Sequence, residues 1–289
     1  MLADETTVVA RAMSGGSNIV RLGGQEARQS LHTAIRQACS AAKITPNQIG
    51  AICIGAAGAA RPEINAAMCS IVRELIPGIA SEKLEVVGDS VIALEAAFGA
   101  GPGVIAIAGT GSIVYGRDAN GLTARAGGWG FAISDEGSGH WIGRHAIASV
   151  MSAHDRGVET ALAQLIPRAW KLGTLDELVQ QANATPSPDF PRLLHVVLQA
   201  AEGGDAVAGE LLAEAGAKLA TLAASVIRRL APDAAAATLP LAMTGSVFRQ
   251  SPQVRQVFYQ ALRKSFPGID VRSNLVEPVE GALARARRF

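Results

Sequence analysis

The segment from Gly99 to Arg144 constrains the fold more than any other part of the chain. A short apolar run, Val104 to Ala108, predicts a buried strand, and a second apolar run, Ile113 to Tyr115, predicts another. The sequence Gly109-Thr110-Gly111-Ser112 connects them. Two glycines in so short a connection let backbone N–H groups approach an anion closely. The pattern predicts two strands joined by a tight loop, which is typical of phosphate sites but also of plain hairpins.

Two further motifs follow in the same segment, after a predicted turn at Asp118-Ala119-Asn120-Gly121. Gly127-Gly128-Trp129-Gly130 comes first, and Ser134-Asp135-Glu136-Gly137-Ser138 precedes a predicted helix that begins near Gly139. Together they place two carboxylates beside flexible backbone. Three histidines lie just downstream, but their spacing lacks a carboxylate-plus-histidine cage, so no protein metal site is predicted at His140, His145 and His154.

In combination, these motifs resemble the second phosphate-binding hairpin of the sugar kinase, actin and heat-shock ATPase superfamily. The Gly-Gly-Trp-Gly and Asp-Glu-Gly-Ser pair is similar, more narrowly, to the N-acetylglucosamine kinase and BadF/BadG/BcrA/BcrD-type ATPase family. The resemblance implies an α/β, two-lobe ribonuclease H-like (actin-like ATPase) fold with a cleft between the lobes. We expect an N-terminal α/β lobe over residues 1–101 and a C-terminal lobe with a helical insertion over residues 102–289.

The first lobe alternates predicted strands and helices, which implies parallel pairing with crossover connections. The strands are expected at Thr6–Met13, Ala51–Ala57 and Glu85–Val87, and the helices at Gln25–Ala42, Pro62–Leu75 and Ser90–Phe98. Asp89 directly follows a strand and precedes a helix, and ligands bind at the carboxyl ends of strands in open α/β sheets. A plain helix cap is the alternative role for this carboxylate. The family resemblance implies that Asp89 is the catalytic base.

The chain after Arg144 is predicted to be mainly helical, because apolar residues recur at three- and four-residue spacing. The expected helices are Trp141–Met151, Glu159–Trp170, Thr174–Gln181, Pro191–Ala201, Asp205–Leu230 and Pro252–Phe266, with strands at Leu239–Met243 and Ile269–Arg272. The final Glu277-Pro278-Val279-Glu280-Gly281-Ala282 is similar to the family's closing motif, which opens the last helix.

The resemblance also implies roles for individual residues. The sugar would be held by Asn18, Ser112, Gly128, Trp129, Gly130 and Asp135. The phosphates of ATP would meet Gly109, Thr110 and Gly111, and its adenosine would be bordered by Gly245 and Ser246. A plain turn is the alternative reading of the Ser14–Asn18 loop, and packing is the alternative role of Trp129. The implied reaction moves the γ-phosphoryl group of ATP to the 6-hydroxyl of an amino sugar, N-acetylglucosamine first among them, with Mg²⁺ implied by the reaction alone.

Composition narrows the classes of partner. The chain has 26 basic and 25 acidic side chains and a net charge of +1, so nucleic acid is not an expected partner. No apolar run reaches the roughly 18–20 residues that a membrane span needs, and Asp4 and Glu5 stand where a signal peptide begins with positive and apolar residues. We therefore expect a cytoplasmic protein whose partner is a small amino sugar; a homodimer is left open.

The sequence also permits three other functions. An ATPase that activates an acyl-CoA dehydratase or reductase would need a cysteine pair for an iron–sulfur cluster, whereas Cys39, Cys53 and Cys69 are widely spaced. A glucosamine kinase and a non-catalytic sugar-binding protein are the others. The family's first phosphate loop, of the form Asp-Gly-Gly-Gly-Thr-Lys, has no counterpart after Met1, so we expect either that the natural start lies upstream or that the chain is truncated.

Overall fold

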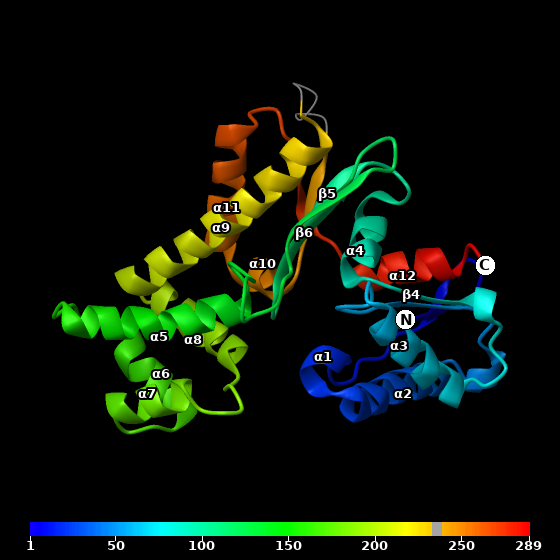
Figure 1. Ribbon diagram of the computed structural model, residues 1–289, viewed down its shortest axis with the longest axis horizontal. Coiled ribbons are helices and arrows are strands. Elements are labelled where there is room, and N and C mark those ends of the chain that lie inside the picture. Colours follow the sequence, from blue (N-terminus) through cyan, green and yellow to red (C-terminus); the bar gives the residue numbers. More distant parts are fainter. Residues whose placement is uncertain (233–238) are drawn as a thin grey trace. The chain divides into compact units, whose positions relative to one another are not determined.

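The computed structural model describes residues 1–232 and 239–289, and these form two compact units (Figure 1). The first unit contains residues 1–100 together with 276–289, and the second contains residues 101–275. The expected C-terminal lobe ran to residue 289, but helix α12 (Pro278–Ala286) packs with the first unit instead. The physical reason is a close helix contact: a Cβ at Gly281 would lie 1.9 Å from the carbonyl oxygen of Ile92.

The first unit is built around strands β3 (Ile52–Gly55) and β4 (Leu84–Val87), which pair in parallel as predicted. Helix α3 (Pro62–Leu75) and the short helix η2 (Ser81–Lys83) make the crossover between them. Met68 and Val72 of α3 lie in one buried apolar cluster with Leu84 of β4. The other elements of this unit are β1 (Leu2–Ala3), β2 (Val8–Ala10), α1 (Ile19–Leu22), α2 (Gly24–Ala41), η1 (Pro46–Gln48) and α4 (Asp89–Phe98).

The N-terminal strand is shorter than the predicted Thr6–Met13. Strand β2 pairs antiparallel with β1, and the chain turns between them. The carboxylate of Asp4 accepts hydrogen bonds from the backbone N–H groups of Thr6 and Thr7 at 2.8 and 2.7 Å, and this side-chain turn competes with extended structure. At the other end Met13 is 90% exposed and lies beyond the strand.

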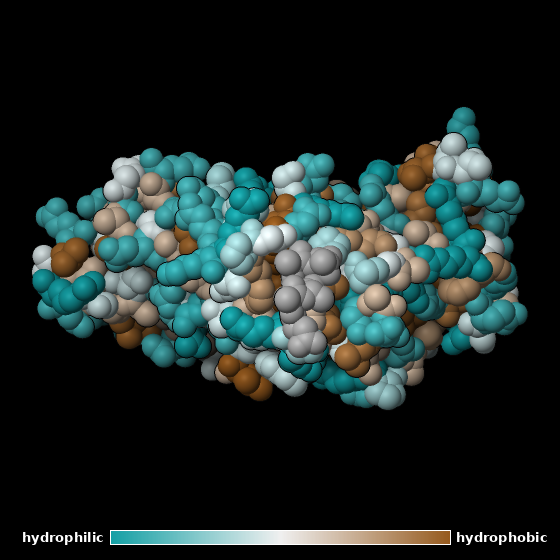
Figure 2. All heavy atoms as spheres, turned by 90° about the horizontal axis from the view of Figure 1, so that it is seen from above, coloured by the Kyte–Doolittle hydropathy of each residue, from teal (hydrophilic) through white to brown (hydrophobic). Residues whose placement is uncertain are grey.

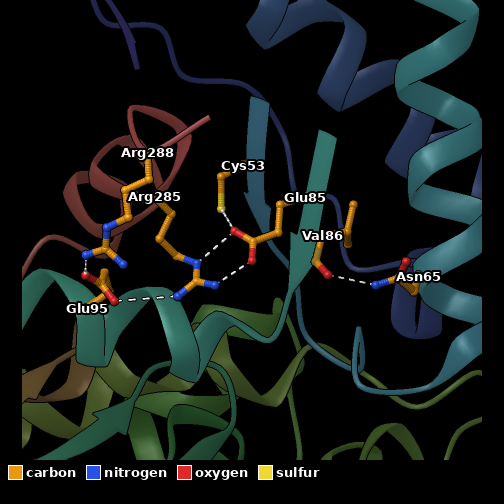
Figure 3. A network of polar contacts seen from close by, with 7 residues as sticks. All are labelled: Cys53, Asn65, Glu85, Val86, Glu95, Arg285 and Arg288. Atoms are coloured by element: carbon orange, nitrogen blue, oxygen red, sulfur yellow. Dashed lines mark hydrogen bonds and ion pairs between the residues drawn. The ribbon is translucent and has the colours of Figure 1, made fainter. Parts of the chain in front are cut away.

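Helix α12 is tied to the first unit by charge as well as by close packing. Arg285 Nε donates to Oε2 of Glu85 on β4 at 2.8 Å, and Arg285 Nη1 lies 3.5 Å from Oε2 of Glu95 on α4 (Figure 3). Arg288 pairs with the same Glu95, whose side chain is only 2% exposed. The paired guanidinium lowers the pKa of Glu85, and that carboxylate raises the pKa of Arg285. Strand β4 and helices α4 and α12 thus share one ion-pair network.

The second unit is organised around a mixed sheet with the strand order β7-β6-β5-β8-β9. Strands β5 (Gly103–Ala108), β6 (Ser112–Arg117) and β7 (Thr123–Gly127) form an antiparallel meander, whereas β8 (Leu241–Thr244) and β9 (Val271–Leu275) are parallel to β5. The long helix α9 (Ala206–Leu230) packs on β5, β6 and β7 and lies beside α11 (Pro252–Ser265) (Figure 1). At that helix crossing a Cβ at Gly216 would lie 2.8 Å from the carbonyl oxygen of Val254.

The second unit also contains α5 (Gly139–Asp155), against which α6 (Leu162–Trp170), η3 (Phe190–Leu193) and α8 (Leu194–Glu202) pack. Helix α7 (Leu175–Ala182) packs against α6, and the short α10 (Ser246–Gln250) lies against β5, β8 and α11. Their buried apolar residues join those of β5, β8 and α9 in one core, which confirms the helix-rich second part predicted from the apolar spacing.

None of the helices in the described part of the chain combines the length and the apolar character that a membrane crossing requires. In the face drawn in Figure 2, hydrophobic residues lie scattered among hydrophilic ones.

Candidate active site

The connection between β5 and β6 is a tight hairpin formed by Gly109, Thr110 and Gly111. Within it the N–H of Gly109 donates to the carbonyl oxygen of Gly111 at 2.9 Å. The N-terminus of α5 binds the other two carbonyls: Gly139 donates to Gly109 at 2.8 Å, and His140 donates to Thr110 at 3.1 Å. The hairpin is therefore attached to the first turn of a helix through its carbonyl groups.

This attachment decides where the free donors of the hairpin point. In a trans peptide the C=O and the N–H that follows it lie on opposite sides. Because the carbonyls of Gly109 and Thr110 face α5, the N–H groups of Thr110 and Gly111 face away from it. In residues 1–232 and 239–289 those two N–H groups donate to no other protein atom. Adjacent unpaired N–H groups in a glycine-containing turn form an anion-binding concavity.

Asp135 lies directly beneath the hairpin. A Cβ at Gly111 would lie 2.9 Å from Asp135 Oδ2, and the backbone N–H of Ser112 donates to Oδ1 at 3.4 Å. The carboxylate is only 8% exposed, and burial raises its pKa, with a smaller rise from the neighbouring Glu136 and an opposing contribution from the Ser112 hydrogen bond. Asp135 also has a φ of +68°, which is uncommon for a residue other than glycine. Hairpin and carboxylate form one compact assembly.

Two serines beside this assembly use their hydroxyl groups to hold the protein chain together. The hydroxyl of Ser112 donates to the carbonyl oxygen of Glu136 at 2.8 Å and is buried, so it ties β6 to the 134–138 turn. The hydroxyl of Ser138 caps α5 by accepting from the N–H of Trp141 at 3.1 Å. Ser112 was expected to contact the sugar, but this geometry directs its hydroxyl into the protein.

Gly128, Trp129 and Gly130 follow β7 and begin a loop beside the hairpin strand β6. A Cβ at Gly128, whose φ is +70°, would lie 2.7 Å from the side chain of Ile113. The ring of Trp129 is 60% exposed, and the guanidinium carbon of Arg125 lies 3.8 Å from the ring centroid. This cation–π contact holds one face of the indole.

The loop after β8 lies next to the hairpin because β5 and β8 are parallel neighbours, with Ile107 opposite Thr244. Gly245 has a φ of +108°, and a Cβ there would lie 2.2 Å from the carbonyl oxygen of Ala108. Only glycine satisfies both conditions. Ser246 then opens the short helix α10. The second unit thus gathers Gly109–Gly111, Asp135 and Gly245 at the carboxyl ends of β5 and β8.

In the first unit, Asp89 lies at the carboxyl end of β4 and begins α4. Gly88 rather than Asp89 is the N-cap, and Asp89 Oδ1 accepts from the N–H of Ser90 at 2.9 Å. Burial raises the pKa of the Asp89 carboxyl, and the hydrogen bonds from its own and the Ser90 N–H groups oppose that rise. A carboxylate fixed at a helix N-terminus with a raised pKa is suited to accept a proton.

Asn18 caps the unexpected short helix α1, because its side-chain oxygen accepts from the N–H of Arg21 at 3.2 Å. That helix packs on the loop after β3: a Cβ at Gly58 would lie 3.4 Å from Val20 Cγ2. The end of β3 is joined to β4, since the N–H of Ala56 donates to the carbonyl of Val87 at 2.9 Å. Asn18 and Asp89 therefore lie at the same carboxyl edge of the first unit.

In the second unit, three residues beside the hairpin and the Gly128–Gly130 loop were missed from the sequence. Arg125 and His140 contact the loop that contains Trp129, and the capping residue Ser138 fixes the helix that holds the hairpin. Ser138 could have been recognised as an N-cap, because a serine just before a helical run of aromatic and apolar residues is a common signal. The contacts of Arg125 and His140 could not, because they form only when the loop is folded.

Cys53 lies beside the ion-pair network of the first unit. Its thiol donates to Glu85 Oε2 at 3.4 Å, and burial, reinforced by that carboxylate, raises its pKa to about 12.

The family model described as the BadF/BadG/BcrA/BcrD ATPase family matches residues 1–286. The N-acetylmuramic acid/N-acetylglucosamine kinase of Clostridium acetobutylicum is 32% identical, over 97% of this chain and 91% of that protein. The N-acetyl-D-glucosamine kinase of Dictyostelium discoideum is 27% identical, over 95% of this chain and 89% of that protein. A Chromobacterium violaceum structure provisionally assigned as an N-acetylglucosamine kinase has a TM-score of 0.74 and 26% identity, covering 96% of this chain and 90% of that one.

These similarities confirm the predicted fold class, an α/β actin-like ATPase fold with many helices in its second part. They extend over nearly the whole chain and include the hairpin, the Gly-Gly-Trp-Gly loop and the Asp89 strand end. The chain belongs to the BadF/BadG/BcrA/BcrD ATPase family.

Proposed function

We propose that this protein is an ATP-dependent kinase that transfers the γ-phosphoryl group to the 6-hydroxyl of N-acetylglucosamine. The observation that carries the proposal is that two relatives from distant organisms, aligned over at least 95% of this chain, are both named as kinases of that sugar. The geometry within each unit supports the assignment, because it supplies an anion-binding hairpin and a positioned base.

ATP is assigned to the second unit. The outward N–H groups of Thr110 and Gly111 would receive phosphate oxygens, and the Thr110 hydroxyl, on an exposed residue, is available to add a third hydrogen bond. Gly245 and Ser246 would border the adenosine, because they follow the strand next to β5. Phosphoryl transfer depends mainly on positioning and on stabilising charge, so rigid backbone donors suit it.

Asp89 is assigned as the general base. Its carboxylate would accept the proton of the sugar 6-hydroxyl as that oxygen attacks the γ-phosphorus, and the bond from phosphorus to the β-phosphate oxygen would break to release ADP. Its carboxylate is oriented by the Ser90 N–H at the start of α4. Its raised pKa strengthens it as a base.

Sugar contacts are assigned in each unit separately. Asn18, whose amide both donates and accepts, suits hydroxyl groups that do the same. Gly128, Trp129, Gly130 and Asp135 would contribute from the second unit. Ser112 contributes indirectly, through its hydrogen bond to the turn that contains Asp135.

Mg²⁺ is expected to enter with ATP. It is usually held by one or two carboxylates together with substrate phosphates rather than by an all-protein cage. The described residues contain no cluster of three or more His, Cys, Asp or Glu side chains that could hold a metal. Within the second unit, Asp135 beside the hairpin is the carboxylate that could contribute, and the cation would neutralise phosphate charge.

The test is ADP release measured with a panel of acceptors: N-acetylglucosamine, N-acetylmuramic acid, glucosamine and glucose. We expect N-acetylglucosamine to have the highest kcat/KM. N-acetylmuramic acid is the second candidate acceptor, because the more similar relative is named for both sugars. Sugar-independent ADP release, or a preference for glucose, would contradict the proposal.

A further inference from the structure

His140 connects two parts of the proposed site by different means. It is the second residue of α5, and its backbone N–H donates to the carbonyl oxygen of Thr110 in the phosphate hairpin at 3.1 Å. Its ring centroid lies 5.0 Å from that of Phe131, with the planes inclined at 42°. The main chain of one residue therefore holds the hairpin, while its side chain contacts the loop that follows β7.

Residues 128–133 of that loop are all exposed, and we call this segment the apolar loop. Three of its large side chains are mostly exposed: Trp129 at 60%, Phe131 at 51% and Ile133 at 79%. Its turn is closed by the N–H groups of Ile133 and Ser134, which donate to the carbonyl of Gly130. Arg125 covers Trp129, and the ring of His140 lies against Phe131. The histidine ring thus joins the apolar loop to helix α5.

The other side of the His140 ring has a fixed support. The centroid of Phe190 lies 5.2 Å away in an edge-on arrangement at 75°, and Phe190 is only 5% exposed. The backbone of Phe190 lies close against α5, because a Cβ at Gly143 would lie 2.0 Å from its carbonyl oxygen. Ring pairs at these separations and angles attract each other specifically. A rigid aromatic residue thus supports the histidine, which in turn supports Phe131.

We propose that His140 is a positioning residue whose ring holds the apolar loop in its sugar-binding position and so sets the affinity for sugar separately from the affinity for ATP. The inference rests on the proposed function, since it takes Gly128 to Gly130 as sugar contacts. The separation follows from the geometry: any side chain at position 140 leaves the backbone bond to Thr110 in place, and only the ring reaches the loop.

The first test compares KM values for N-acetylglucosamine and for ATP in His140→Ala and His140→Phe. In His140→Ala we expect a roughly 3- to 10-fold rise in the sugar KM, the scale of one lost aromatic pair, with the ATP KM within about twofold of the parent. His140→Phe keeps a planar ring and is expected to restore the sugar KM. His145→Ala is the matched control, because its ring stacks at 3.9 Å on Trp141 in the same helix, away from the loop.

The second test measures hydrogen–deuterium exchange, so it does not depend on catalysis. We expect faster exchange over residues 128–133 in His140→Ala, unchanged exchange over 109–112, and parent-like exchange in His140→Phe. If the parent phosphorylates no amino sugar, the proposed function fails, and exchange alone decides whether His140 holds the loop. Unchanged exchange over 128–133, equal changes in both KM values, or no rescue by phenylalanine would overturn the inference.

Discussion

Replacing Gly111 by alanine should impair catalysis although the backbone there permits any residue. Gly111 has no positive φ, so alanine meets no conformational barrier, and the obstacle is a single contact. The new Cβ would lie 2.9 Å from Oδ2 and 3.2 Å from Cγ of Asp135. Gly50, an exposed glycine outside the proposed site, provides the matched control, because a Cβ there also meets nothing within 4 Å.

The magnitude follows from how little Asp135 can move. Ordinary carbon–oxygen contact would require the carboxylate or the hairpin to shift by several tenths of an ångström. The carboxylate is 8% exposed and accepts the Ser112 N–H, so it is not the free end of a flexible side chain. Overpacking of this kind costs about 1–3 kcal/mol. If the overpacking destabilises the catalytically active arrangement of the hairpin and Asp135 by that amount, kcat/KM falls by about 5- to 150-fold.

Steady-state rates with ATP and N-acetylglucosamine measure the effect in Gly111→Ala and Gly50→Ala, with urea unfolding midpoints recorded for both. We expect the large loss only in Gly111→Ala, and a rate within about threefold of the parent in Gly50→Ala, since open space imposes no overpacking cost. Equal rates in the two variants would refute the reasoning that the hairpin and Asp135 act as one assembly.

Three further predictions concern the first unit. Asp89→Asn should lower kcat by about 10²–10⁴-fold while sugar binding measured by calorimetry persists, and near-parent turnover would leave Asp89 as a helix-terminal residue only. Because burial raises the pKa of Asp89 and the base acts deprotonated, kcat/KM should fall with decreasing pH at a pH above the usual aspartate range; a profile flat down to about pH 4 would contradict this. Glu95→Gln, at a carboxylate 2% exposed between two arginines, should reduce the free energy of unfolding in urea by about 2–4 kcal/mol. Glu280→Gln, in a pair more than half exposed, should cost at most about 1 kcal/mol, and equal losses would count against the network.

Local patterns predicted much of the fold. Helix α3 begins and ends where expected, at Pro62 and Leu75, because a proline suits the first helical position and the apolar residues follow at helical spacing. The position of Asp89 after a buried strand and the hairpin between β5 and β6 were also predicted correctly. Each of these features depends on residues close together in the sequence.

Features that depend on distant contacts could not be predicted in this way. The last helix joins the first unit through the contact of Gly281 with Ile92, which no local pattern records. Helix α1 has only four residues, too few for apolar periodicity, although its cap at Asn18 was noticed for another reason. In the candidate site, the hydroxyl of Ser112 is bound by the carbonyl of Glu136 in a turn that lies beside it only after folding.

The most direct test of the central claim is the identity of the phosphorylated product. Incubation with Mg-ATP and N-acetylglucosamine should release ADP and consume the sugar in equal amounts, and nuclear magnetic resonance should locate the phosphate on the 6-oxygen. The 6-deoxy analogue, which binds but lacks the acceptor hydroxyl, should yield no ADP above the sugar-free rate. Phosphate on another hydroxyl, or equal ADP release with the 6-deoxy sugar, would contradict the account.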